Sequence, residues 1–250
     1  YDDPWKAVED FQQYTKVAAQ NPELGSQALA TRLGLPRGRV RAWSNGSKPD
    51  VYKGIQTAQS RGWLSGAPKS TRVEKPTVGL AAWALSSGAV SISIHDGARV
   101  SFVVAPERED DFKSLAAAAG LACQFVYRDE GERVQEARPQ QGGSVFARVL
   151  AAMDIPVGEN SGRKSIMHLP PFVRLLGEKG KVAFARIYVL NQGVDINDTE
   201  VITIRENRPA PYLQELTSLL KTVLEGEVTR DGDTITVSST AVKGLHSESY

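Results

Sequence analysis

The stretch LAAWALSSGAVSISIHD, from Leu80 to Asp96, decides the fold of this 250-residue chain. Its first half is a run of small and apolar residues that closes at Ser87 and Gly88. Its second half alternates strictly, with valine and isoleucine on one side and Ser91, Ser93 and His95 on the other. The pattern therefore predicts a buried helix that runs directly into a strand with one core face and one polar face.

A second stretch of the same kind, FARIYVLNQGVD, begins at Phe184 and places Gln192 directly before Gly193. Turn signals of the Asp-Gly and Glu-Gly type follow each stretch and predict hairpins. Each copy is expected to read helix, two strands, helix, two strands. The predicted strands and helices are 89–95, 99–105, 106–120, 122–128 and 132–137 in the first copy, and 201–205, 209–224, 227–230 and 234–238 in the second. An internal repeat of this length indicates a duplicated domain.

The two stretches and the order of elements resemble the LAGLIDADG homing endonucleases over residues 78–240. A connecting segment, FARVLAAMDIPVG, resembles the extra helix and loop that join the two halves in that family. The resemblance implies an α+β fold in which two motif helices pack together and the strands form two antiparallel, saddle-shaped sheets over duplex DNA.

In that family an acidic residue before the motif glycine holds the metal that cuts DNA. Ser87 and Gln192 stand at those positions here, and both are neutral. Asp154 and Asp195 lie nearby in sequence but are better explained as turn or surface residues. His95, His168 and His246 show no metal-binding spacing. We therefore expect no catalytic residue, no metal and no other cofactor, and predict that the chain is not an enzyme.

Alternation also predicts which strand residues would face DNA. Short hydroxyl groups, amides and guanidinium groups can hydrogen-bond base edges and phosphates without adding negative charge. The predicted contacts are Ser91, Ser93, His95, Arg99, Ser101, Gln124, Arg128, Arg133 and Gln135 in the first copy, and Thr203, Arg205, Thr229, Arg230, Thr234 and Thr236 in the second. The alternative is an ordinary antiparallel sheet with one wet face.

Charge is distributed unevenly along the chain, although its formal net charge is only +1. Residues 1–75 carry 12 Lys and Arg against 7 Asp and Glu, whereas the rest of the chain carries 18 against 22. A basic N-terminal region of this kind suits a polyanionic partner, and the alternative is a solvated surface.

Within that basic region, SQALATRLGLPRGRVRAW has the spacing of a helix-turn-helix. Leu29, Ala30 and Leu33 would form the inner face of the first helix, Gly34 would make the turn, and Val40 would anchor the second helix. The predicted DNA contacts are Arg37, Arg39, Arg41, Ser44, Asn45 and Lys48.

These patterns predict a helix-turn-helix domain at 1–64, a linker at 65–76, a first LAGLIDADG-like copy at 77–143, a connecting helix and loop at 144–178, and a second copy at 179–245. The single cysteine and the lack of a long apolar run favour a cytoplasmic protein that does not enter membranes.

The function expected from this organisation is sequence-specific binding of double-stranded DNA, as a transcriptional regulator derived from a homing endonuclease. The transcription machinery is a further expected partner, and the chain is expected to bind as a monomer because the duplication is internal. The alternatives are an active or cryptic homing endonuclease, an RNA-binding maturase-like splicing factor, and a module that binds only protein.

Overall fold

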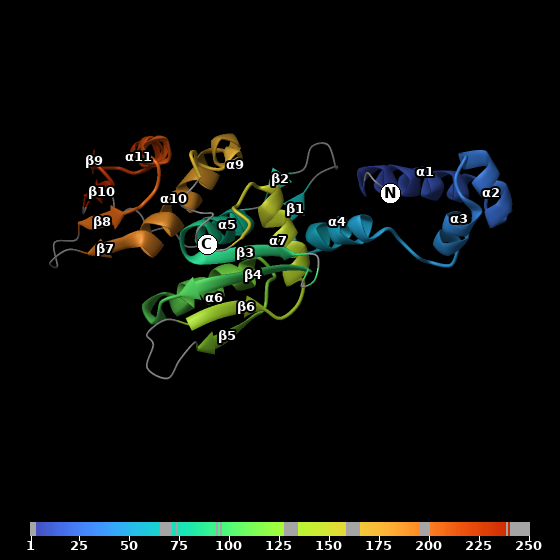
Figure 1. Ribbon diagram of the computed structural model, residues 1–250, viewed down its shortest axis with the longest axis horizontal. Coiled ribbons are helices and arrows are strands. Elements are labelled where there is room, and N and C mark those ends of the chain that lie inside the picture. The colour runs from blue at the N-terminus through green and yellow to red at the C-terminus, as the bar shows by residue number, and fades with distance from the viewer. Residues whose placement is uncertain are drawn as a thin grey trace. The chain divides into compact units, whose positions relative to one another are not determined.

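The computed structural model describes residues 4–65, 72–73, 75–93, 95, 97–127, 135–158, 166–195, 201–238 and 240. The chain divides into two compact units, Tyr1–Ser60 and Arg61–Tyr250, which are taken separately below (Figure 1). Among the helices in these ranges, none combines the length and the apolar character that crossing a bilayer requires.

The first unit consists of four helices, α1 (Pro4–Gln20), α2 (Ser26–Leu33), α3 (Arg37–Ser44) and α4 (Asp50–Ser60). Helix α2 stops at Gly34, whose φ of 64° lies in the left-handed region. Glycine adopts this conformation at little cost, and the amide of Leu35 then donates a hydrogen bond to the carbonyl oxygen of Ala30 at 3.0 Å. This turn redirects the chain so that α3 begins directly after Pro36.

Aromatic rings hold the four helices together. The Phe11 ring meets the Trp43 ring edge-on at 5.3 Å and the Tyr52 ring at 4.7 Å. Leu29 and Val40 fill the space beside them and are buried. Residues from all four helices therefore share one small core, and α2 and α3 are fixed against α1.

The second unit contains two copies of one arrangement. Copy 1 comprises α5 (Lys75–Ser87), β3 (Gly88–Ser93), β4 (Gly97–Val104), α6 (Glu109–Ala118), β5 (Cys123–Tyr127) and β6 (Gln135–Pro139). Copy 2 comprises α10 (Glu178–Gln192), β7 (Gly193–Asp195), β8 (Ile202–Arg205), α11 (Ala210–Val223), β9 (Val228–Asp231) and β10 (Thr234–Val237). A short 3-10 turn, η1 (Pro106–Arg108), precedes α6, and β1 (Leu64–Ser65) pairs with β2 (Arg72–Val73) before copy 1 begins.

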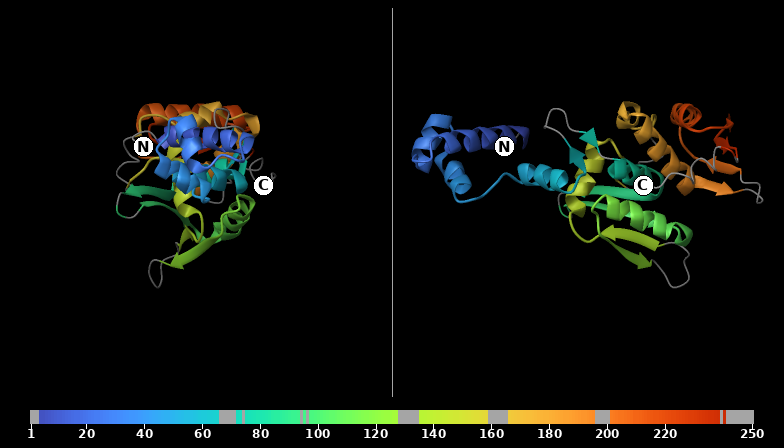
Figure 2. Two further views of the ribbon diagram at one scale, coloured as in Figure 1. Left: turned by 90° about the vertical axis from the view of Figure 1, so that its right-hand side faces the viewer. Right: turned by 180° about the vertical axis from the view of Figure 1, so that it is seen from behind.

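Both copies form a four-stranded antiparallel sheet with the same strand order. The order is β3-β4-β6-β5 in copy 1 and β7-β8-β10-β9 in copy 2. Helix α6 lies along the first sheet and α11 along the second (Figures 1 and 2). The predicted α+β class, the duplication and the two antiparallel sheets are confirmed.

Helices α5 and α10 pack against each other at the centre of the second unit. Every residue of α5 from Thr77 to Ser86 is buried, which explains why its sequence is apolar on all sides. In copy 1 the Trp83 ring stacks edge-on against Phe112 at 5.0 Å and its Nε1 donates to the Val103 carbonyl at 3.0 Å. The helix is therefore anchored to both α6 and β4.

Gly88 and Gly193 occupy equivalent places, where each central helix turns into its first strand. A Cβ atom on Gly88 would lie 2.7 Å from the Ala84 Cα and 2.8 Å from the Ser101 carbonyl oxygen. A Cβ atom on Gly193 would lie 2.0 Å from the Ile202 Cγ2. Close packing, and not an unusual φ angle, therefore requires glycine at both turns.

The segment between the copies contains α7 (Gly143–Ala152) and α9 (Pro171–Leu175). After α7 the chain reaches Val157, which forms a parallel bridge to Val90 at the edge of the first sheet. Further along, the Glu215 carboxylate on α11 accepts hydrogen bonds from His168 Nδ1 at 2.8 Å and the Leu169 amide at 2.9 Å. The connecting segment is therefore attached to both copies.

Candidate nucleic-acid interface

One face of the first sheet is polar and uncovered by helices. Along β4 every second residue from Ala98 to Val104 is buried, which turns Arg99 and Ser101 to the opposite face. The strand register places Ser91 opposite Arg99, Arg138 opposite Gln124, and Glu136 opposite both Val103 and Val126. This face of sheet 1 joins residues from all four strands, namely Ala89, Ser91, Ser93, Arg99, Ser101, Arg138 and Gln124, together with the buried Glu136 and the apolar Val103 and Val126 beside it.

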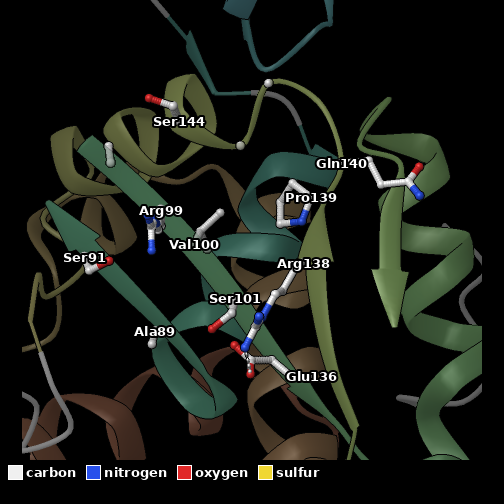
Figure 3. A pocket seen from close by; sticks show the side chains of 13 residues that line it. Ala89, Ser91, Arg99, Val100, Ser101, Glu136, Arg138, Pro139, Gln140 and Ser144 are labelled. Carbon is white, nitrogen blue, oxygen red and sulfur yellow. Dashed lines mark hydrogen bonds and ion pairs between the residues drawn. The ribbon is translucent and has the colours of Figure 1, made fainter. Parts of the chain in front are cut away.

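A groove of about 700 Å³ lies over this face and extends to the start of α7. Figure 3 shows Arg99 and Ser101 rising from β4 beside Arg138 and Glu136 of β6. The Arg138 Nη2 lies 2.8 Å from the Glu136 carboxylate, and this hydrogen bond raises the pKa of Arg138. The guanidinium group is thus charged and held in one direction, although more than half of the side chain stays exposed.

The second sheet also turns a polar face away from its helix. Ile204, Val228, Ile235 and Val237 are buried beneath α11. The alternate residues form the opposite face: Thr203, Arg205, Thr229, Asp231, Thr234 and Thr236. Thr236 stands directly between Thr203 and Thr229, so that one row of threonines crosses three strands.

Most of the predicted strand contacts lie on these two polar faces, namely Ser91, Ser93, Arg99, Ser101, Gln124, Thr203, Arg205, Thr229, Thr234 and Thr236. His95 is exposed in the turn after β3 and does not belong to the strand. Arg128 and Arg133 lie outside the described residues.

The predicted facing of Gln135 and Arg230 is wrong. Gln135 is buried and its amide donates to Glu109 at 2.5 Å on the helix-covered side of the sheet. Arg230 pairs with Ile235 across the strands and reaches the Ala210 carbonyl at the start of α11. Successive strand residues point to opposite faces of a sheet. Gln135 and Arg230 therefore lie on the faces opposite to those of the other predicted DNA contacts in their sheets.

The residues that the prediction missed on sheet 1 are Glu136 and Arg138. Both lie one place out of step with Arg133 and Gln135, because β6 begins at Gln135 and turns Ala137 toward the core. Ala137 was the only apolar residue between Val134 and Pro139, and its position could have set the correct face.

The C-terminal ends of α5 and α10 meet through hydrogen bonds from copy 2 to copy 1. The Asn191 Nδ2 donates to the Ser86 Oγ at 3.1 Å, and the Gln192 Nε2 donates to the Ser86 carbonyl at 2.5 Å. The Arg208 Nη2 lies 3.4 Å from the Leu85 carbonyl. Gln192 and Arg208 satisfy carbonyl groups that the end of a helix leaves without partners, and Asn191 bonds to the Ser86 hydroxyl group. We call Asn191, Gln192 and Arg208 the helix-end clamp.

The LAGLIDADG resemblance implies a divalent metal at this point, and the donor set does not fit one. Magnesium is held in proteins through one or two carboxylates together with waters, and calcium through carboxylates, carbonyl oxygens and waters. Here Ser87 offers a hydroxyl group, and Gln192 directs its amide nitrogen at the Ser86 carbonyl. Within the described ranges, no three His, Cys, Asp or Glu side chains are placed to hold a metal together.

The double variant Ser87→Asp, Gln192→Glu is expected to acquire metal binding that the unmodified chain lacks. Two carboxylates side by side repel each other, so the melting temperature should fall in EDTA and recover in millimolar Mn²⁺. Differential scanning calorimetry with and without Mn²⁺ measures both effects. Ser87→Asn serves as the uncharged control, and a comparable Mn²⁺-dependent rise in the unmodified chain would contradict the assignment.

Behind the helix-end clamp lies a buried polar cluster. The Tyr188 hydroxyl donates to the Glu206 carboxylate and lies 3.0 Å from the Tyr212 hydroxyl. Arg208 lies 3.4 Å from Glu206, and its guanidinium carbon lies 5.0 Å from the centre of the Tyr212 ring. Burial, followed by the neighbouring Tyr212 and Glu206, raises the pKa of Tyr188 well above its usual range. The phenol therefore stays protonated and acts as a donor.

In the first unit, the predicted row of three arginines on α3 does not form. Arg37 and Arg41 are one helical turn apart and exposed, whereas Arg39 is half-buried and lines a hollow with Ala7 and Trp43. A helix turns 100° per residue, so Arg39, which is two positions from Arg37 and from Arg41, lies on a different face of α3 from those two residues.

The other predicted contacts of this unit are exposed. The Ser44 hydroxyl accepts a hydrogen bond from the Tyr14 hydroxyl at 3.2 Å, Asn45 follows the end of α3, and the Lys48 Nζ lies 3.2 Å from the Gln56 Oε1.

No family model matches the sequence, and no curated protein matches it. The structure is similar to the homing endonuclease I-WcaI bound to its DNA recognition sequence, at 11% identity, a TM-score of 0.46 and coverage of 75% of this chain and 85% of that one. It is also similar to I-DmoI in complex with DNA and Mn, at 12% identity, a TM-score of 0.41 and coverage of 69% and 94%. A third similar structure is the N-terminal LAGLIDADG domain of DUF199/WhiA, at 9% identity, a TM-score of 0.40 and coverage of 70% and 83%.

The prediction that the chain is not an enzyme is contradicted by these comparisons and is withdrawn. I-WcaI is a homing endonuclease, and so is I-DmoI, which has also been solved as mesophilic variants. Neutral residues stand at the ends of α5 and α10, at Ser87 and Gln192. Their presence does not by itself exclude an enzymatic activity.

Proposed function

We propose that the chain binds double-stranded DNA in a sequence-specific manner through the exposed faces of its two sheets. The observation that carries this proposal is the matching construction of the two copies. Each sheet has the same strand order, packs its apolar face under helices and leaves a face of short polar and guanidinium side chains uncovered. Such side chains hydrogen-bond base edges in the major groove.

Charge on these faces supports the same proposal. On sheet 1, Arg99 and Arg138 stand with the carboxylate of Glu136, which is itself paired with Arg138. On sheet 2, Arg205 adds a third guanidinium group, and Asp231 is a carboxylate on the same face. Arginine contacts both phosphates and the O6/N7 edge of guanine, and a carboxylate beside it fixes its direction.

The first unit supplies a further basic surface around Arg37 and Arg41. Two helices joined by a glycine turn, with arginines exposed on the second, are suited to entering a major groove. This unit ends at Ser60 and α5 begins at Lys75, which narrows the proposed domain 1–64 and linker 65–76, and the unit would contact DNA separately from the two sheets. The resulting site would be longer than one helix-turn-helix can read.

Two uses of such binding are open to test. One is regulation of transcription, in which the chain occupies its site without cutting it. The other is DNA cleavage as a homing endonuclease, for which α5 and α10 end side by side, although Ser87 and Gln192 place no carboxylate there to hold a metal.

A selection from randomised duplex DNA in buffer with Mg²⁺ tests all of these readings in one reaction. Retained and uncut fragments that share a long motif would support a regulator, and defined cleaved ends would support an endonuclease. Enrichment from a parallel pool of structured RNA, with none from DNA, would favour a maturase-like role. Failure to enrich any nucleic acid would overturn DNA binding.

Arg138→Ala is expected to weaken binding to the selected site about tenfold or more, because one well-placed arginine contact to guanine contributes about 1–3 kcal/mol of discrimination. Fluorescence anisotropy with labelled duplex measures the change. Lys179→Ala is the charge-matched control, since Lys179 is exposed at the start of α10, far along the helix from the sheets. Equal losses in both variants would show a general charge effect and contradict a specific contact.

A further inference from the structure

The exposed face of sheet 2 differs chemically from that of sheet 1. Sheet 1 presents arginine, serine, glutamine and glutamate side chains, and its described polar face contains no threonine. Sheet 2 presents four threonines: Thr203, Thr229, Thr234 and Thr236. The two halves of the second unit would therefore present different groups to a bound duplex.

The threonines lie close together because of the strand register. Thr236 is directly opposite both Thr203 and Thr229. Thr234 is two residues from Thr236 on the same strand and so shares its face. Thr203 is buried, Thr229 is exposed, and Thr234 and Thr236 are half-exposed. Three threonines are thus accessible from the solvent in one patch.

Threonine side chains are stiff and carry both a methyl group and a hydroxyl group. Branching at Cβ restricts χ1, so that a strand holds the methyl group in a defined direction. The hydroxyl group accepts or donates, and distinguishes the bases poorly, whereas the methyl group makes apolar contact with the C5-methyl group of thymine. That methyl group marks thymine in the major groove.

We infer that sheet 2 reads thymine through methyl contacts from Thr229, Thr234 and Thr236, so that the half-site beneath copy 2 is thymine-rich. The half-site beneath copy 1 instead contains guanine read by Arg138. This inference rests on the proposed DNA binding and adds the base class that each half recognises. Exposed threonine is also common on wet strands because it suits the β conformation, and the test separates the two explanations.

Deoxyuridine provides the test, because it differs from thymidine only in lacking the C5-methyl group. Each thymine of the selected duplex is replaced singly by deoxyuridine, and the affinity of the whole chain is measured by fluorescence anisotropy. Substitution at contacted positions should weaken binding about fourfold for each methyl group, as expected for one methyl group that is no longer buried. Positions read by copy 1 should not respond.

Two variants of Thr236 assign the contact. Thr236→Ser removes the methyl group and keeps the hydroxyl group, and should abolish the response to deoxyuridine at the contacted position. Thr236→Val keeps the methyl group and should retain the response. Thr222→Ser is the matched control, because Thr222 is exposed on α11, which covers the opposite face of sheet 2.

Tight binding to duplex DNA without any response to deoxyuridine would overturn the inference and leave the proposed function intact. A response that persists in Thr236→Ser and in the corresponding variants Thr229→Ser and Thr234→Ser would also overturn it. The absence of duplex binding would instead overturn the proposed function, and the two failures are therefore distinguishable.

Discussion

Arg208→Ala is expected to lower the free energy of unfolding of the second unit by about 4 kcal/mol, the usual cost of leaving one partner of a buried ion pair alone. Arg208 and Glu206 expose only 6% and 9% of their side chains. Without the guanidinium group the Glu206 carboxylate stays buried beside two phenols, and the Leu85 carbonyl loses a donor. Urea unfolding followed by tryptophan fluorescence measures the loss.

The double variant Arg208→Ala, Glu206→Gln distinguishes a buried charge from a lost side chain. Removal of the carboxylate charge should recover a substantial part of the stability, because a neutral amide is less costly to bury than a lone carboxylate. Tyr212→Phe is expected to cost only about 1 kcal/mol, as for one neutral hydrogen bond. If the double variant were no more stable than the single one, the charge pair would not be the source of the effect.

Gly193→Ala and Gly88→Ala are the other substitutions with large expected effects, each destabilising by about 3 kcal/mol as overpacked sites do. The added Cβ would meet backbone on both sides at Gly88, and the Ile202 side chain together with the Val189 carbonyl at Gly193. Backbone atoms cannot move aside cheaply within a helix and a paired strand.

Thermal unfolding followed by circular dichroism measures both glycine variants. Gly177→Ala is the matched control, because nothing lies within 4 Å of a Cβ at that position and its φ is −66°. Gly193→Ala combined with Ile202→Ala should recover only the part of the loss that the Ile202 side chain causes, since the Val189 carbonyl stays 2.5 Å from the added Cβ. A neutral result at both motif glycines would contradict close packing as the reason for glycine.

The duplication could be predicted because its signals are local. A uniformly apolar helix, a glycine at the turn and an alternating strand are each readable within about seventeen residues, and they recur in the same order. Hairpins closed by short turns account for the pairs of consecutive strands, whereas the pairing of β4 with β6 and of β8 with β10 joins strands that are not consecutive. The prediction was most accurate where the helical or the alternating pattern of apolar residues ran without interruption.

The faces of individual strands were harder to predict. In QEARP the inward and outward residues are both mostly polar, so that only Ala137 reports the direction. A shift of one residue then exchanges Gln135 for Glu136. Arg230 shows the same limit, since it was assigned with Thr229 although adjacent strand residues diverge.

Contacts between distant elements could not be predicted at all. Asn191 and Arg208 meet the end of α5 only because α10 and β8 are folded around it, more than a hundred residues along the chain. Polar residues at such places have no periodic pattern of their own. They are found only when the tertiary partners are known.

The helix-end clamp has a consequence for how the chain evolves. Counted back from the motif glycines, Ser86 and Ser87 of copy 1 correspond to Asn191 and Gln192 of copy 2. Copy 2 supplies long amide donors and copy 1 supplies the acceptors, so each copy has become specialised. A homodimer of either copy would place two donor ends or two acceptor ends together and would lose these hydrogen bonds. The two copies are thus not interchangeable, and either copy alone would lack the groups to which its helix end bonds.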